Sequence, residues 1–270
     1  MADTDTPHAI LTRLADTLSG VLAPDFTKDV FRAEEIKQSA TARVMLLKLG
    51  DIRAVAKIFA GSEAGRAAFG RERRVLEGLP AGLAPRLRFV SEPDRVLVSD
   101  FVAGSALGAG LNGDNLMQRA EFLGQWFGRL AGAVPSEETE TDWNAYLARY
   151  RHGFNPDILA QQAAALKRVP IARLTLAHND NALSNFILGA DKRLYGVDFE
   201  DARLKPEGWD LITAATALLR RLPEELQTIA SALSRGYGMG APEAALPDGF
   251  EAVIGRVALA QLAEGAAKAT

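Results

Sequence analysis

The stretch LTLAHNDNALSNFILGADKRLYGVDFEDA, from Leu174 to Ala202, places a histidine and several Asp and Asn residues between apolar segments. The runs LTLA, FIL and LYGV are typical of short buried strands, and GADKR is a turn. A packed core gains nothing from so many small polar groups, because each buried polar group needs a partner. We therefore interpret this stretch as a binding or catalytic site.

Two side chains of the expected hairpin are candidate ligands of a hard cation. A four-residue loop, Ala190–Arg193, would place Asn185 opposite Asp198. Directly opposed Cβ atoms lie about 5 Å apart, and Mg²⁺ takes carboxylate and amide oxygens. Asn185 and Asp198 could thus share one Mg²⁺, and Asp180 supplies a second carboxylate that could handle a proton.

The spacing of these residues is more informative than their type. Asp and Asn are common in turns, because their side chains bond the local backbone. The order strand, H-x-D-x-x-x-x-N, hairpin, D-F-E has the spacing of the kinase catalytic loop followed by the metal-binding D-F-G. A metallophosphoesterase could also use a His-Asn-Asp cluster, but it normally needs more His and Asp ligands. The chain has three His in total, which favours phosphoryl transfer.

The segment resembles the aminoglycoside phosphotransferase and choline kinase superfamily. HNDNALSN resembles the family's H-G-D-x-x-x-x-N, VDFEDA resembles I-D-[WF]-E-x-A, and EGWDL resembles the Asp-Leu that follows; the resemblance is specific over Leu174–Leu211. It implies an α+β, bilobal protein-kinase-like fold. The N-lobe, residues 1–101, would be a small antiparallel sheet with one inserted helix, and the C-lobe, residues 102–270, would be larger and mostly helical.

The resemblance also implies a role for each matching residue of the stretch. Asp180 would be the catalytic base that deprotonates the acceptor hydroxyl. Asn185 and Asp198 would ligate Mg²⁺ between the phosphates of ATP or GTP. His178 would brace the loop, and Asp210 would bond the backbone of the catalytic loop as a structural acid.

A kinase also needs a strand lysine, held by a helix Glu, to bind the nucleotide phosphates. AVAKIF supplies Lys57, and GRERRVLEGL supplies Glu72, which we prefer to Glu77 because it matches the family's E-x-x-x-L-x-x-L. The stretch LVSDFVAG would be the hinge between the lobes, and its backbone around Asp100 and Val102 would bind the adenine.

The expected phosphate-covering loop departs from the family pattern. It should join strands Phe31–Ile36 and Arg43–Leu49, and it reads KQSATARV without a glycine. Glycine lets backbone N–H groups approach phosphates closely. Ser39 and Thr41 could instead donate through their hydroxyls; the alternative is a plain hairpin loop.

Helical spacing predicts most of the remaining elements. The expected helices are Ile10–Leu22, the inserted helix Gly65–Leu79, Asn115–Val134, Trp143–Arg151, Asp157–Lys167, Trp209–Arg221, Pro223–Gly236 and Phe250–Ala267. The Gly-rich VAGSALGAGLNGDN is the expected boundary between the lobes.

Composition excludes several other classes. The net charge of −3 offers no general basic field for nucleic acid or an anionic membrane, and the absence of Cys excludes disulfides and thiolate metal sites. The start lacks the pattern of a secretion signal, and no uncharged apolar run reaches about 18 residues. We expect a cytoplasmic protein.

The predicted activity is transfer of the ATP γ-phosphate to a hydroxyl of a small molecule, such as an aminoglycoside, a choline- or ethanolamine-like amino alcohol, or a sugar. A nucleotide-binding pseudokinase is the alternative, and the glycine-free loop supports it. A protein kinase is disfavoured, because the short link Arg203–Trp209 leaves no room for a long activation segment. Candidate acceptor-binding side chains are Asp142, Glu200, Asp201, Trp126, Trp143, Tyr146, Tyr150 and Trp209.

Overall fold

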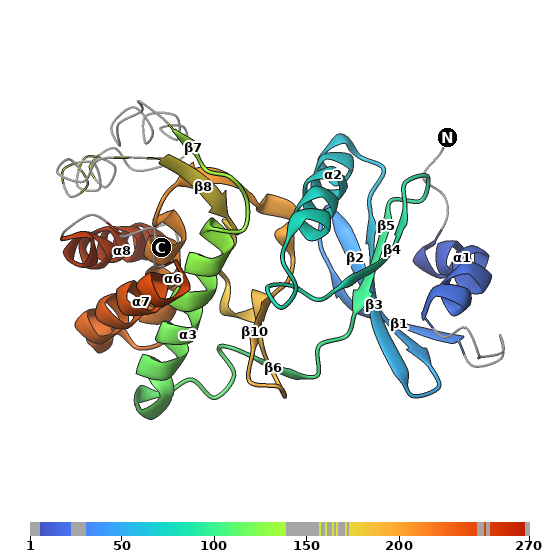
Figure 1. Ribbon diagram of the computed structural model, residues 1–270, viewed down its shortest axis with the longest axis horizontal. Helices are drawn as coiled ribbons and strands as arrows, with labels where there is room; N and C mark the ends of the chain where they lie inside the picture. The colour runs from blue at the N-terminus through green and yellow to red at the C-terminus, as the bar shows by residue number, and fades with distance from the viewer. Residues whose placement is uncertain are drawn as a thin grey trace. The chain divides into compact units, whose positions relative to one another are not determined.

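The computed structural model describes residues 6–22, 31–138, 173–241 and 249–267, with the single residues 157, 160, 164, 166, 171 and 246. The chain forms two compact units (Figure 1). The first comprises Met1–Gly104 and Tyr195–Asp201, and the second comprises Ser105–Leu194 and Ala202–Thr270. The expected helix Trp143–Arg151 and all but four residues of Asp157–Lys167 lie outside the described part of the chain.

The first unit is built on an antiparallel five-stranded sheet with the order β1-β2-β3-β5-β4. Its strands are β1 (Phe31–Gln38), β2 (Ala42–Leu49), β3 (Ile52–Phe59), β4 (Leu87–Ser91) and β5 (Val96–Asp100), and its helices are α1 (Pro7–Leu22) and α2 (Glu63–Gly78). One helix is thus inserted between β3 and β4, as predicted.

The two helices pack against opposite faces of this sheet (Figure 1), because successive side chains of a strand alternate between its faces. Ile58 of β3 belongs to the same apolar cluster as Leu11 of α1. Phe59, the next residue, packs edge-on against Phe69 of α2. Lys57 therefore lies on the face that α2 covers.

The second unit is mostly helical. Its helices are α3 (Gly113–Ala131), α6 (Trp209–Leu219), α7 (Leu226–Gly240) and α8 (Phe250–Ala267). It also has a small sheet with the order β11-β8-β7, made of β7 (Glu137–Glu138), β8 (Arg173–Ala177) and β11 (Arg203–Pro206). The chain forms one more three-stranded sheet, with the order β10-β9-β6, made of β6 (Gly104–Ala106), β9 (Phe186–Gly189) and β10 (Leu194–Gly196). Within the described residues, no helix has the length and apolar character to span a membrane.

The structure corrects the expected hairpin around the polar stretch. Asn185 ends a 3₁₀ helix, η2 (Leu183–Asn185), and β9 begins only at the next residue. Strand β10 ends at Gly196, two residues before Asp198, whose φ of 69° is incompatible with a strand. Neither Asn185 nor Asp198 belongs to a strand, so cross-strand register does not pair them.

Other elements also differ from the expectation. Strands β6, β7 and β11 were not predicted, because each is short and lies in a segment whose sequence is typical of a loop. The helix expected at Pro223–Gly236 is a 3₁₀ turn, η4 (Pro223–Glu225), followed by α7, which continues to Gly240.

Helices α3 and α7 cross at close range through two pairs of glycines. Gly124 and Gly128 of α3 lie against the backbone of α7, and Gly236 and Gly240 of α7 lie against the backbone of α3. A Cβ added at Gly236 would lie 2.1 Å from the carbonyl oxygen of Glu121. The crossing therefore requires residues without a side chain at these positions.

Gly236→Ala should lower the free energy of unfolding by about 1–3 kcal/mol, because the added Cβ forces the helices apart. Gly238 is the matched control, since a Cβ there meets nothing within 4 Å. Gly238→Ala should raise stability slightly, by up to about 1 kcal/mol, because alanine favours the helix. Urea unfolding monitored by circular dichroism measures both; equal effects of the two substitutions would contradict the close crossing.

Candidate active site

The ammonium group of Lys57 is the centre of a charged cluster in the first unit. Its Nζ donates to Glu72 Oε2 at 2.6 Å, donates to Asp198 Oδ1, and lies 3.3 Å from Glu200 Oε2. Lys57 and Glu72 are only 8% and 5% exposed. The predicted pair of Lys57 and Glu72 is therefore present, whereas Glu77 pairs with Arg73 on the surface of α2.

The charges of this cluster depend on one another. Burial disfavours the charged form of Lys57, but the carboxylates of Glu72, Asp198 and Glu200 together raise its pKa above the ordinary value. Burial raises the pKa of Glu72 more than Lys57 lowers it. Burial also opposes ionisation of Asp198, yet Lys57 and Lys37 lower its pKa. The cluster therefore keeps a charged ammonium beside an ionised Asp198.

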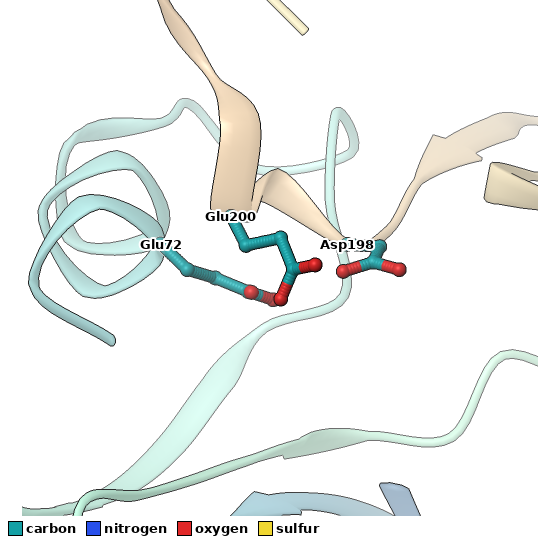
Figure 2. A group of neighbouring side chains, drawn as sticks. All are labelled: Glu72, Asp198 and Glu200. Atoms are coloured by element: carbon teal, nitrogen blue, oxygen red, sulfur yellow. The ribbon is translucent and has the colours of Figure 1, made fainter. Parts of the chain in front are cut away.

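The three acids could hold a metal ion. Figure 2 shows Glu72 extending from α2 toward Glu200, with Asp198 beside them, and one oxygen of each lies within 4.8 Å of the others. Carboxylate oxygens are the ligands that Mg²⁺ prefers. The donor set therefore fits Mg²⁺, and Asp198 is the member that the sequence predicts as a ligand.

Local contacts hold the Asp198 segment in the first unit. The 3₁₀ helix η3 (Phe199–Asp201) follows Asp198 directly. Arg71 of α2 donates from Nε to the Glu200 carbonyl at 2.6 Å, and the Thr41 hydroxyl donates to Glu200 Oε2 at 2.9 Å. These contacts tie the segment to α2 and to the loop between β1 and β2.

The glycine-free loop is closed by its own serine. Ser39 exchanges backbone and hydroxyl contacts with Ala42: its N–H donates to the Ala42 carbonyl at 2.8 Å, and its Oγ accepts from the Ala42 N–H at 3.0 Å. The Ser39 hydroxyl therefore stabilises the turn, and the Thr41 hydroxyl contacts Glu200.

The expected adenine-binding segment begins at the last residue of β5. The N–H of Asp100 donates to the Arg86 carbonyl at 3.0 Å. Phe101 lies under the guanidinium of Arg53, 4.3 Å from the ring centroid. Val102 follows outside any strand.

Asp180 and Asn185 contact each other in the second unit. The Asn185 amide donates to Asp180 Oδ2 at 2.8 Å, and the Ala182 N–H donates to Asp180 Oδ1 at 3.3 Å. Because the amide nitrogen of Asn185 faces Asp180, its amide oxygen is the atom that could bind a cation. The loop thus orients the carboxylate that the sequence predicts as the base.

Asp210 bonds the backbone of the same loop. Its carboxylate accepts from the N–H of His178 at 2.8 Å and of Asn179 at 3.1 Å, and from the Asn181 amide at 2.8 Å. Burial raises the pKa of Asp210 against these lowering hydrogen bonds. Asn179 has a φ of 66°, so the backbone is strained where Asp210 holds it.

His178 is fully buried among aromatic rings. Its ring centroid lies 5.8 Å from that of Trp126 and 5.2 Å from that of Phe186. This environment suits a bracing residue. It also corrects the expectation for Trp126, which is 1% exposed and therefore packs in the core instead of contacting an acceptor.

The other acceptor candidates are only partly described. Trp209, Glu200 and Asp201 are partly exposed. Asp142, Trp143, Tyr146 and Tyr150 lie outside the described residues. Lys37 and Asn181 were not predicted as site residues, because Asn181 takes a variable position of HNDNALSN and Lys37 only precedes the small residues of the glycine-free loop.

The sequence matches a known family, and the fold is similar to those of several solved structures. Residues 32–247 match the model of the phosphotransferase enzyme family (APH). Similar solved structures include choline kinase from Cryptosporidium parvum Iowa II (TM-score 0.63, 9% identity, 93% of this chain and 85% of that one) and macrolide 2'-phosphotransferase MphH from Brachybacterium faecium (0.60, 18%, 96% and 94%). Spectinomycin phosphotransferase APH(9)-Ia, solved with ADP and spectinomycin, has a TM-score of 0.55 at 12% identity, covering 93% and 85%. No curated protein matches the sequence.

The chain belongs to the phosphotransferase enzyme family, because the family model covers most of its length. Its fold is the α+β, protein-kinase-like fold of the aminoglycoside phosphotransferases and choline kinases, as the sequence predicts.

Asp210→Ala should lower the free energy of unfolding by about 3 kcal/mol, because it leaves the N–H groups of His178 and Asn179 without their acceptor. Asp210→Asn keeps one acceptor oxygen and should lose less. Urea unfolding of both variants measures the difference, and full stability of Asp210→Ala would show that the carboxylate does not support the loop.

Proposed function

We propose that the protein transfers the γ-phosphate of ATP or GTP, with Mg²⁺, to a hydroxyl group of a small molecule. The observation that carries the proposal is the buried ammonium of Lys57, held by Glu72 and next to the carboxylate of Asp198. Phosphoryl transfer depends on positioning and on charge stabilisation, and this cluster supplies both.

The first unit would bind the nucleotide. Lys57, fixed by Glu72, would bind its phosphates, and the carbonyl of Asp100 with the backbone of Val102 would bind the base. Asp198 would hold Mg²⁺, with Asn185 as the second ligand that the sequence predicts. When bound, Mg²⁺ would neutralise the charge that develops on the phosphate oxygens.

The second unit would act on the acceptor. Asp180 would orient the acceptor hydroxyl and accept its proton. The hydroxyl oxygen forms a bond to the γ-phosphorus while the bond to the β-phosphate oxygen breaks, so that ADP leaves. The Asn185 amide and the backbone contacts of Asp210 would keep the Asp180 carboxylate in place.

A small acceptor fits the chain better than a protein. The link from Arg203 to Trp209 is mostly the strand β11, which pairs with β8, and so offers no long activation segment. The similar structures are kinases named for choline, a macrolide and spectinomycin. The contacts of Lys57 with Glu72 and Asp198 give no support to the pseudokinase alternative.

Millimolar Mg²⁺ with ATP or GTP should raise the melting temperature, because a ligand that binds only the folded state stabilises it. Asp198→Ala should abolish or greatly weaken this shift, since it removes a metal ligand. Asp180→Asn should retain it, since Asp180 acts on the acceptor. Asp51→Asn, in the exposed turn between β2 and β3, is the matched control. The absence of any shift for the unmodified protein would refute nucleotide binding.

Turnover should require Asp180. In an assay of ADP release with aminoglycosides, macrolides, choline, ethanolamine and sugars, we expect one class to stimulate release. Asp180→Asn should then lower kcat by about 10²–10⁴-fold with little change in acceptor affinity. Robust phosphorylation of a generic protein, with no response to any small molecule, would contradict the proposed acceptor class.

A further inference from the structure

A bulge in β1 turns Lys37 toward the face of the sheet that carries Lys57. Glu35 pairs with Met45, but the register then shifts by one, so Lys37 pairs with Val44. Val44 in turn pairs with Lys57 on β3. Directly opposed residues of a sheet point to the same face, so Lys37 and Lys57 lie on one face, separated by a single strand.

Without the bulge, this lysine would be on the other face. A regular ladder continuing from the pair Glu35–Met45 would place Lys37 opposite Arg43, which pairs with Ile58. Ile58 packs on the side of α1. A shift of one residue exchanges the faces of a strand, and here it brings a second ammonium group to the face of Lys57.

The two lysines share one carboxylate. Lys37 Nζ donates to Asp198 Oδ2 at 2.7 Å, and Lys57 Nζ contacts Oδ1 of the same residue. The Lys57 side chain is 10% exposed and is fixed by Glu72, whereas the Lys37 side chain is 53% exposed. Lys37 can therefore leave Asp198 at small cost, and Lys57 cannot.

We propose that Lys37 is a positioning residue that binds the terminal phosphates of the nucleotide. The inference rests on the proposed function, in which Mg²⁺ takes the Asp198 carboxylate. With Mg²⁺ held by Asp198, the Lys37 ammonium would give up Oδ2 and would donate to the phosphate oxygens of the nucleotide. Lys37 thus supplies a side-chain donor at the loop that has no glycine and whose Ser39 hydroxyl closes its own turn.

If Lys37 only neutralised Asp198, its removal would change the affinity for the metal–nucleotide in the opposite direction. If the lysine only balanced the charge of Asp198, it would compete with Mg²⁺, and its removal would tighten binding of the metal–nucleotide. If it binds phosphate, its removal weakens binding, and more for the triphosphate than for the diphosphate. The sign of the change therefore distinguishes the two roles.

Isothermal titration calorimetry with Mg·ATP and Mg·ADP provides the test. Lys37→Gln should weaken Mg·ATP binding about five- to ten-fold, as loss of a partly exposed charge-assisted hydrogen bond implies, and should reduce the preference for ATP over ADP. Lys37→Arg should restore most of the affinity. Lys48→Gln is the matched control, since Lys48 of β2 pairs with Glu34 of β1 at 3.1 Å and its side chain is about as exposed as that of Lys37. This variant should bind both nucleotides like the unmodified protein.

The outcomes separate this inference from the proposed function. Unchanged or tighter Mg·ATP binding by Lys37→Gln would overturn the role of Lys37 and leave the phosphotransferase proposal intact. Equal weakening by Lys48→Gln would also overturn it, since a general loss of charge would then explain the effect. Failure of the unmodified protein to bind either nucleotide would overturn the proposed function and this inference with it.

Discussion

The buried ammonium group of Lys57 is the constraint on which the first unit depends. A charge taken out of water is costly unless it is paired and hydrogen-bonded. Lys57 meets this requirement through Glu72 of α2 and Asp198 of the Tyr195–Asp201 segment. The strand, the helix and a segment from far along the chain therefore have to be held together, and the loop between β1 and β2 joins them through Thr41 and Glu200.

The same carboxylates that stabilise Lys57 are the groups that the proposed chemistry needs. Asp198 contacts two lysines in the structure, and in the proposed function the more exposed Lys37 would give up its contact to a metal ion. Negative groups placed side by side are unfavourable without a cation, which is a common property of functional sites. Lys57 and Lys37 offset part of this negative charge, because both ammonium groups contact Asp198.

The second unit supports the loop that carries Asp180 by contacts with its backbone. The Asp210 carboxylate accepts from two consecutive N–H groups of the loop, and His178 is enclosed by aromatic rings. The glycine crossing of α3 and α7 brings two helical backbones together in the same unit. The loop itself holds Asp180 and Asn185 in contact through the Asn185 amide.

The sequence by itself determined the local parts: the catalytic-loop spacing, the strand with Lys57 and the helix with Glu72. These follow from short spacings and hydrophobic periodicity, which are local properties. The role of Asp210 as a backbone partner was implied by the family resemblance of EGWDL. Only the tertiary structure decided that Lys37 reaches Asp198, that Thr41 contacts Glu200, and that Asn185 and Asp198 lie outside strands. A bulge, a positive φ and contacts between residues some 160 positions apart depend on how the whole chain packs, and no local pattern encodes them.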